Sequence, residues 1–143
     1  TPARAGPLRR LGARVPVIEA HAALRVLVVH PPSSIARDFI DYPYFADLGA
    51  VQAAAVLEPL AEVTLVDALA LPGAGLRWRD DGRAQLGADT KQVLAACEQP
   101  AELVIVALTP FHRPPLRDDL LAETLVGLRA RHPEATLVLA DLY

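Results

Sequence analysis

Four short apolar runs, separated by segments of other composition, restrict the possible folds of this 143-residue chain more than any other feature. The first is Val26 to Val29, which Pro31 and Pro32 close. A continuous apolar run rich in β-branched residues is typical of a strand buried on both faces. Proline cannot donate to a sheet ladder, so we expect the strand to end there in a rigid loop.

The remaining runs and the segments between them predict alternating strands and helices. Strands are predicted at 24–29, 62–66, 103–108 and 136–139. One helix is predicted to begin near Asp47 or Leu48 and to end before Pro59. A second helix is predicted to begin at the capping box that Asp89 forms with Gln92. The third runs over 116–130 on a leucine stripe, with Asp118 on its polar side. Leu76 to Leu86 is predicted to form a small hairpin around Asp80-Asp81-Gly82.

This alternation predicts an α/β fold with a doubly wound, Rossmann-like or flavodoxin-like parallel sheet. We expect at least four strands in the order 2-1-3-4, in a three-layer α/β/α arrangement. Residues 1–23, rich in Ala, Pro, Arg and Gly, are predicted to be an arm or linker, and 24–143 a single domain. Because domains of this type commonly have a fifth strand and helix, we expect a piece of a longer protein, or a domain without its last unit.

Composition argues against several classes of partner. The net charge is −3, and the basic residues of the arm are not interleaved with aromatics, so we expect no nucleic-acid partner. No apolar run approaches the roughly 20 residues of a membrane span. The single cysteine, Cys97, excludes an internal disulfide and a cysteine-based metal cluster, and the start of the chain lacks a secretory apolar region. We therefore expect a cytoplasmic protein without a membrane partner.

The predicted strand order locates a candidate site. The switch point lies between the first and third strands, so the loops at 31–46 and 109–115 should face each other across one crevice. His30 and His112 both stand at strand ends, where they either converge or hydrogen-bond to their own loops. Ser33, Ser34 and Thr109 suit hydrogen bonds to a polar ligand, although ordinary loop chemistry explains them equally well.

Other residues have a structural interpretation beside a functional one. Asp67 is more simply explained by capture of a backbone donor than by ribose binding. Cys97 is expected to be a small buried hydrophobe, and His132 an incidental surface residue, as is His21. The aromatic residues form either a wall for a large flat ligand or the loop's own packing: Tyr42, Tyr44, Phe45 and Phe111. Neither a G-x-G-x-x-G fingerprint nor a G-x-S-x-G elbow is present.

Four motifs, taken in order and spacing, carry a resemblance to a known family. They are Val-Leu-Val-Val-His-Pro-Pro (26–32), Asp-Leu-Gly-Ala-Val-Gln-Ala-Ala-Ala-Val-Leu (47–57), Glu-Val-Thr-Leu-Val-Asp-Ala (62–68) and Leu-Val-Ile-Val-Ala-Leu-Thr-Pro (103–110). Together they resemble the N-terminal cobalamin-binding domain of B12-dependent radical SAM enzymes. That family typically has Asn-Pro-Pro after the first strand, Pro-Leu-Gly-Leu opening the helix, a Val-x-x-Val-Asp strand, and a strand that ends in Gly-Ile-Ser-x-x-Thr.

The resemblance implies a Rossmann-like sheet that binds cobalamin (vitamin B12) without a protein histidine below the cobalt. Mapped by position, the cofactor contacts would come from Pro32, Ser33, Ser34, Leu48, Gly49, Leu108, Thr109 and Asp141. It implies no catalytic residue and no metal ligand in this chain.

Departures from the family pattern restrict the claim. His30 replaces the usual Asn, Asp47 replaces Pro, and Ala-Asp-Leu-Tyr (140–143) stands where Gly-Gly-Pro-His is frequent. The Cys-x-x-x-Cys-x-x-Cys motif is missing, so an iron–sulfur cluster and S-adenosylmethionine would belong to a radical SAM barrel domain, the expected partner, outside this chain. The prediction is therefore a cofactor-binding domain that assists methyl transfer or related radical chemistry. Two alternatives remain open: a non-catalytic interaction module that has lost the cofactor, and a small enzyme domain acting on a nucleotide or sugar.

Overall fold

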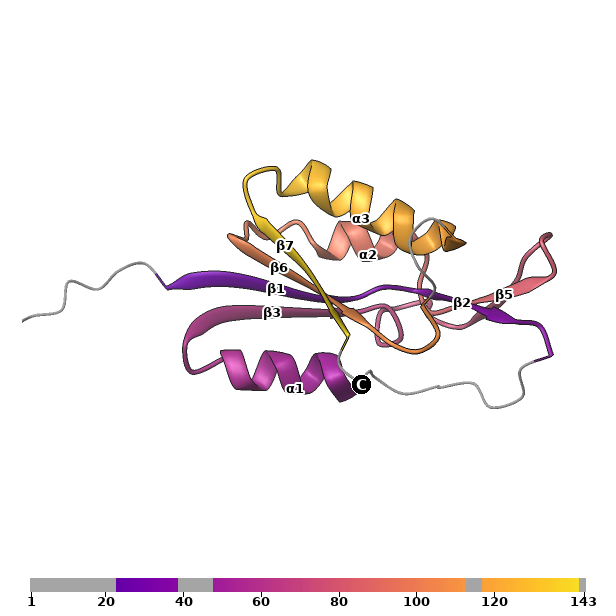
Figure 1. Cartoon of the computed structure of the whole chain (residues 1–143), viewed down its shortest axis with the longest axis horizontal. Helices are drawn as coiled ribbons and strands as arrows, with labels where there is room; N and C mark the ends of the chain where they lie inside the picture. The colour runs from indigo at the N-terminus through magenta and orange to yellow at the C-terminus, as the bar shows by residue number, and fades with distance from the viewer. Residues whose placement is uncertain (1–22, 39–47, 113–116, 142–143) are drawn as a thin grey trace, which may run out of the picture.

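Four parallel strands form the central sheet of the computed structural model, which describes residues 23–38, 48–112 and 117–141. They are β1 (Leu24–His30), β3 (Ala61–Asp67), β6 (Leu103–Leu108) and β7 (Thr136–Asp141), and they lie in the order β3-β1-β6-β7 (Figure 1). Counted along the chain, these four strands have the order 2-1-3-4, so the predicted topology is confirmed. The numbering differs only because three further strands belong to a second sheet.

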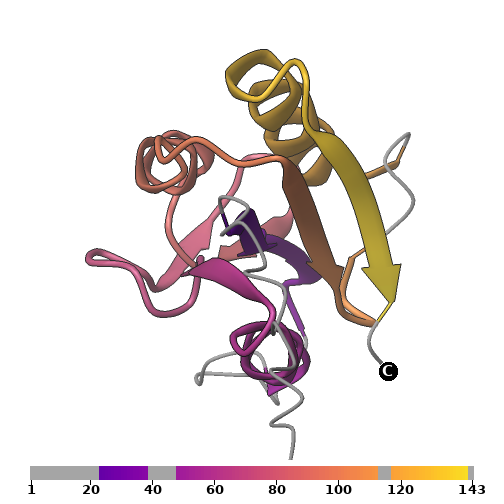
Figure 2. The ribbon, with the colours of Figure 1, turned by 90° about the vertical axis from the view of Figure 1, so that its left-hand side faces the viewer.

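Helices cover both faces of this sheet, which confirms the three-layer α/β/α arrangement. Helix α1 (Leu48–Leu57) packs on one face against β1 and β3. Helices α2 (Thr90–Ala96) and α3 (Asp119–Arg131) pack side by side on the other face (Figures 1 and 2). The right-handed crossovers expected for parallel strands lead to this alternation of faces.

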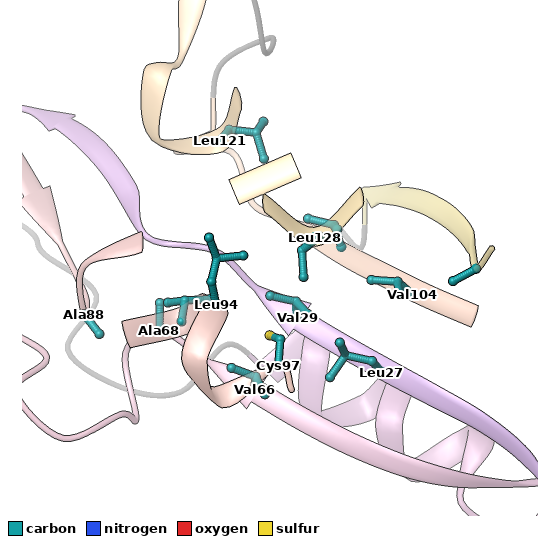
Figure 3. Close-up of a cluster of buried hydrophobic side chains, with 13 residues drawn as sticks. Leu27, Val29, Val66, Ala68, Ala88, Leu94, Cys97, Val104, Leu121 and Leu128 are labelled. Atoms are coloured by element: carbon teal, nitrogen blue, oxygen red, sulfur yellow. The ribbon is translucent and has the colours of Figure 1, made fainter. Parts of the chain in front are cut away.

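The core is divided by the sheet into two clusters, because successive side chains of a strand point to opposite faces. Leu27 and Val29 of β1 pack under α2 and α3 (Figure 3). Val26 and Val28 point the other way and pack near Ala50 of α1. These four side chains are at most 2% exposed, which explains why the run from Val26 to Val29 is uninterruptedly apolar.

A second, antiparallel sheet extends from the carboxyl end of β1. It consists of β2 (Ser33–Ala36), β5 (Arg83–Leu86) and β4 (Leu76–Trp78), in the order β2-β5-β4. The predicted hairpin is confirmed as β4 and β5. The prediction that Ser33 and Ser34 belong to a loop was wrong: the two prolines lie between strands, where no ladder donor is needed, and Ile35 of β2 is buried against Ala84 and Leu86.

The helix ends show what local sequence signals could and could not predict. The capping box is confirmed. The Asp89 side chain accepts the backbone N–H of Gln92, and the Gln92 side chain accepts the backbone N–H of Asp89. Asp118, however, is not on the polar face of α3. It is the buried N-cap, which accepts from the backbone N–H of Leu121, and α3 begins only at Asp119.

Several predictions lie outside the described residues. These concern the arm up to residue 22, Asp47 as a cap, the start of the third helix at Leu116, and the aromatic residues Tyr42, Tyr44 and Phe45. In the part of the chain that the structure describes, no helix has both the length and the apolar character needed to cross a membrane.

Candidate functional site

The carboxyl ends of the parallel strands bring His30 and Asp67 together. These two residues are register partners, the last of β1 and of β3, and His30 Nδ1 lies 2.8 Å from Asp67 Oδ1. His30 is 3% exposed and Asp67 is 5% exposed. Asp67 Oδ1 also accepts the backbone N–H of Leu69 at 2.8 Å, which confirms the predicted capture of a backbone donor. The carboxylate therefore orients the His30 ring, and among the described residues no hydrogen bond reaches His30 Nε2.

His112 ties the segment after β6 to the segment after β1. The backbone N–H of Thr109 donates to His112 Nδ1 at 3.0 Å, so the ring carries its proton on Nε2. That nitrogen donates to the carbonyl of Pro31 at 3.2 Å. Burial lowers the pKa of His112, and the neighbouring His30 ring lowers it further, while the Pro31 carbonyl opposes both effects. His112 is thus held neutral between the two segments.

The rings of His30 and His112 touch edge to face. Their centroids are 5.5 Å apart and their planes are at 88°. The two histidines therefore converge in space, and the segments after β1 and β6 meet at the predicted switch point. The same contact fills the space directly between these two strand ends.

The first three predicted cofactor contacts belong to the second sheet. Pro32, Ser33 and Ser34 are all buried, and the two serines lie in β2 opposite β5. Ser34 Oγ accepts from Arg83 Nε at 2.7 Å, and its backbone carbonyl accepts from the same guanidinium. The contacts of Ser34 with Arg83 therefore consolidate the pairing of β2 with β5.

The other five predicted contacts lie at the carboxyl edge of the parallel sheet or beside it. Leu108 and Asp141 are register partners at the ends of β6 and β7, and Thr109 follows Leu108. Thr109 Oγ1 accepts the backbone N–H of Phe111 at 3.3 Å. Leu48 and Gly49 form the first turn of α1, which starts at the end of the molecule where β7 finishes (Figure 1).

Small side chains gather where α1 begins beside the sheet, and we call this place the α1 corner. Ala107 and Ala140 are register partners on the face that α1 covers, and Ala107 belongs to the same buried cluster as Ala50. Gly49 is buried beside Ala50, whereas Leu48 is 62% exposed. The α1 corner combines short side chains with an exposed apolar one, which suits an apolar ligand edge.

A hollow lies at the opposite edge of the sheet. It is a cavity of about 500 Å³ at the amino ends of the strands, lined in part by Arg25, Glu62 and Pro100. None of the predicted contacts lines it. Arg25 is already paired there with Glu102 at 3.1 Å, and both side chains are about half exposed.

His132 was predicted to be a surface residue, and this prediction was wrong. The ring is buried, and its Nε2 lies 2.9 Å from the backbone carbonyl of Cys97, so it connects the ends of α2 and α3. The His-Pro pair indicates only the end of a helix, and nothing in the local sequence signals this tertiary contact. Cys97 is fully buried, as predicted.

Over the described residues, no group of three or more His, Cys, Asp or Glu side chains is arranged to hold a metal ion. No family model, curated protein or solved structure matches the chain.

Proposed function

We propose that this chain is a corrinoid-binding domain, the cobalamin-holding part of a B12-dependent radical SAM enzyme. The observation that carries the proposal is the meeting of the segments after β1 and β6 at the switch point of a doubly wound sheet, beside a corner lined by small residues. Ligands of open α/β sheets bind at such switch points, outside the carboxyl ends of the strands.

The side chains of the described residues are compatible with a metal that is already coordinated by a macrocycle. A free ion needs several protein ligands, and the described residues offer no such group. A corrin ring supplies four nitrogen ligands itself, so the protein has only to bind its edges and its tail. When bound, the corrinoid would carry a methyl group or assist a radical reaction in a barrel domain outside this chain.

The residues expected to hold the cofactor fall into two groups, those that would contact it and those that would support the site. Leu48 and Gly49 would contact it from α1, and Leu108, Thr109 and Asp141 from the ends of β6 and β7. Pro32, Ser33 and Ser34 support the site from behind, because they are buried in or next to the second sheet. The ring contact between His30 and His112 directs the ligand toward the α1 corner rather than between the strand ends.

The proposal is tested by incubating the purified chain with hydroxocobalamin and separating bound from free corrinoid by gel filtration. We expect corrin absorbance to elute with the protein. Ala140→Phe, which places a large ring beside Ala107 on the face of the sheet where α1 packs, should reduce the retained corrinoid at least about tenfold, a change equivalent to about 1.4 kcal/mol. Leu139→Phe is the matched control, since Leu139 points to the other face of the same strand and should leave retention unchanged. A native chain that retains no corrinoid would contradict the proposal.

A non-catalytic interaction module is the second candidate. It is favoured by the closed contact between His30 and His112, and by Phe111, which packs against the buried cluster of Ile35, Ala84 and Leu86 instead of facing a ligand. This candidate predicts no corrinoid retention by the native chain and no effect of Ala140→Phe. The gel-filtration experiment therefore separates the two.

A further inference from the structure

The last residues of the parallel strands form a row on the face of the sheet that α1 covers. His30 points to this face, because side chains alternate along β1 and Val28 packs near α1. Asp67 is the register partner of His30 on β3. The register of β1 with β6 continues to Ala107 on the other side of His30, and Ala140 of β7 follows. The row therefore has an imidazole next to two short side chains.

Asp67 determines which nitrogen of the His30 ring has the lone pair. Its Oδ1 lies 2.8 Å from His30 Nδ1 and also accepts the backbone N–H of Leu69. A carboxylate oxygen only accepts, so Nδ1 is the donor and the lone pair of the neutral ring is on Nε2. The two nitrogens of an imidazole ring point in diverging directions, so Nε2 is directed away from Asp67. A neutral imidazole nitrogen of this kind is the commonest protein ligand of metals.

This Nε2 has no hydrogen-bond partner among the described residues, although His30 is only 3% exposed. Over the same residues, Thr90 Oγ1 is the only side-chain nitrogen or oxygen that is both fully buried and without a partner. His30 Nε2 is therefore not fully buried and keeps contact with the surface. Buried polar groups are almost always paired, so an oriented lone pair left open at a switch point indicates a ligand.

The other histidines that the structure describes are placed differently. Both ring nitrogens of His112 are used within the protein, by the Thr109 N–H and the Pro31 carbonyl. His132 precedes β7, at the amino ends of the strands, and its Nε2 contacts the carbonyl of Cys97. Of these three rings, only that of His30 combines a carboxylate partner with an open nitrogen at the carboxyl ends of the strands.

We infer that His30 Nε2 is an axial ligand of the corrinoid cobalt, and that Asp67 positions the ring. This inference rests on the proposed function, and it departs from the resemblance, which implies no protein histidine below the cobalt. Histidines that ligate a metal almost always donate their other ring N–H to a partner such as a carboxylate. Because the described residues contain no group of three such ligands, His30 suits a metal whose remaining ligands come from a macrocycle.

The test uses cobinamide, a corrinoid without the nucleotide tail, so that a nitrogen ligand outside the ring has to come from the protein. The purified chain is incubated with cobinamide, separated from free corrinoid by gel filtration and reduced to cobalt(II). We expect electron paramagnetic resonance to show the cobalt lines split into triplets by one axial nitrogen. In a chain whose histidines carry the heavy nitrogen isotope, the triplets should become doublets.

Variants then identify the histidine. His30→Gln keeps an N–H for Asp67 but has no imidazole, and it should abolish the splitting. Asp67→Asn keeps an acceptor but loses the charge, and it should reduce the retained cobinamide by about tenfold. His132→Gln is the matched control, a substitution of a buried histidine outside the site, and His21→Gln tests for incidental binding. Both should leave the splitting unchanged.

The outcomes separate this inference from the proposed function. A native chain that retains neither cobinamide nor hydroxocobalamin would overturn both. Retained cobinamide without nitrogen splitting, triplets that persist in the labelled chain, or splitting that survives His30→Gln would overturn the ligation by His30 alone. The isotope measurement uses the native sequence, so it does not depend on how the variants fold.

Discussion

Replacement of His112 by alanine is the sharpest perturbation of the proposed site. It removes the hydrogen bond from the backbone N–H of Thr109 to Nδ1 at 3.0 Å and the one from Nε2 to the Pro31 carbonyl at 3.2 Å, together with the contact between Thr109 Oγ1 and Nδ1 at 3.1 Å. Each contributes about 1 kcal/mol net, and the buried backbone groups left behind add a desolvation penalty. We expect His112→Ala to lower the free energy of unfolding by about 2–3 kcal/mol.

The same ring predicts how stability depends on pH. Burial lowers the pKa of His112 below its ordinary value of 6.5, so the unfolded chain binds a proton more readily than the folded one. The contribution of His112 is therefore fully present above pH 6.5 and is lost as the pH falls below that value. Protonation of the buried ring would also place an N–H on Nδ1. This N–H would oppose the backbone N–H of Thr109, which donates to Nδ1 in the neutral ring.

Urea unfolding followed by circular dichroism, at about pH 7.5 and about pH 5.5, measures both effects. His112→Gln is the control, because glutamine keeps one acceptor and one donor but does not titrate. We expect it to cost less than His112→Ala and to flatten the pH dependence. Two results would refute the reasoning: an alanine variant as stable as the native chain, or a glutamine variant with the pH dependence of the native chain.

Three further predictions concern the packing under α2 and α3. Leu121→Ala should lower the free energy of unfolding by about 2–5 kcal/mol in urea titrations, because the side chain is fully buried in the main core cluster. Gly127→Ala should lower the melting temperature, because a Cβ there would lie 2.3 Å from Leu94 Cδ1. The resulting strain of about 1–3 kcal/mol exceeds the gain in helix propensity. An unchanged or raised melting temperature would contradict this prediction. Burial raises the pKa of the Cys97 thiol to about 12, so a thiol reagent at mildly alkaline pH should react with it only after urea is added, and prompt reaction in native buffer would show that the thiol is exposed.

Much of the fold follows from patterns that act over a few residues. The run Val26 to Val29 predicts a central strand because a strand packed on both faces needs apolar side chains in both directions. Alternation of strands and helices then leaves few topologies, and right-handed crossovers select the observed order. The capping box at Asp89 and the hairpin of β4 and β5 are equally local, so they were predicted correctly.

The candidate site was predicted less completely, because its position and its contacts have different physical origins. The switch point follows from strand order, and the meeting of His30 with His112 is consistent with it. The burial of Ser33 and Ser34 depends on β5, about 50 residues further along the chain, whose Arg83 bonds to Ser34. A serine after Pro-Pro has the same local sequence whether it faces a ligand or pairs with a distant strand.

Local sequence thus specified where strands, caps and the switch point occur, since backbone geometry and apolar periodicity act within a few residues. Only the tertiary structure decided which polar side chains are buried and what they bind. His132 became a link between two helices, because packing brought the distant carbonyl of Cys97 beside its ring. Burial of a polar group is permitted only where such a partner exists, and partners from remote segments leave no trace in the local pattern.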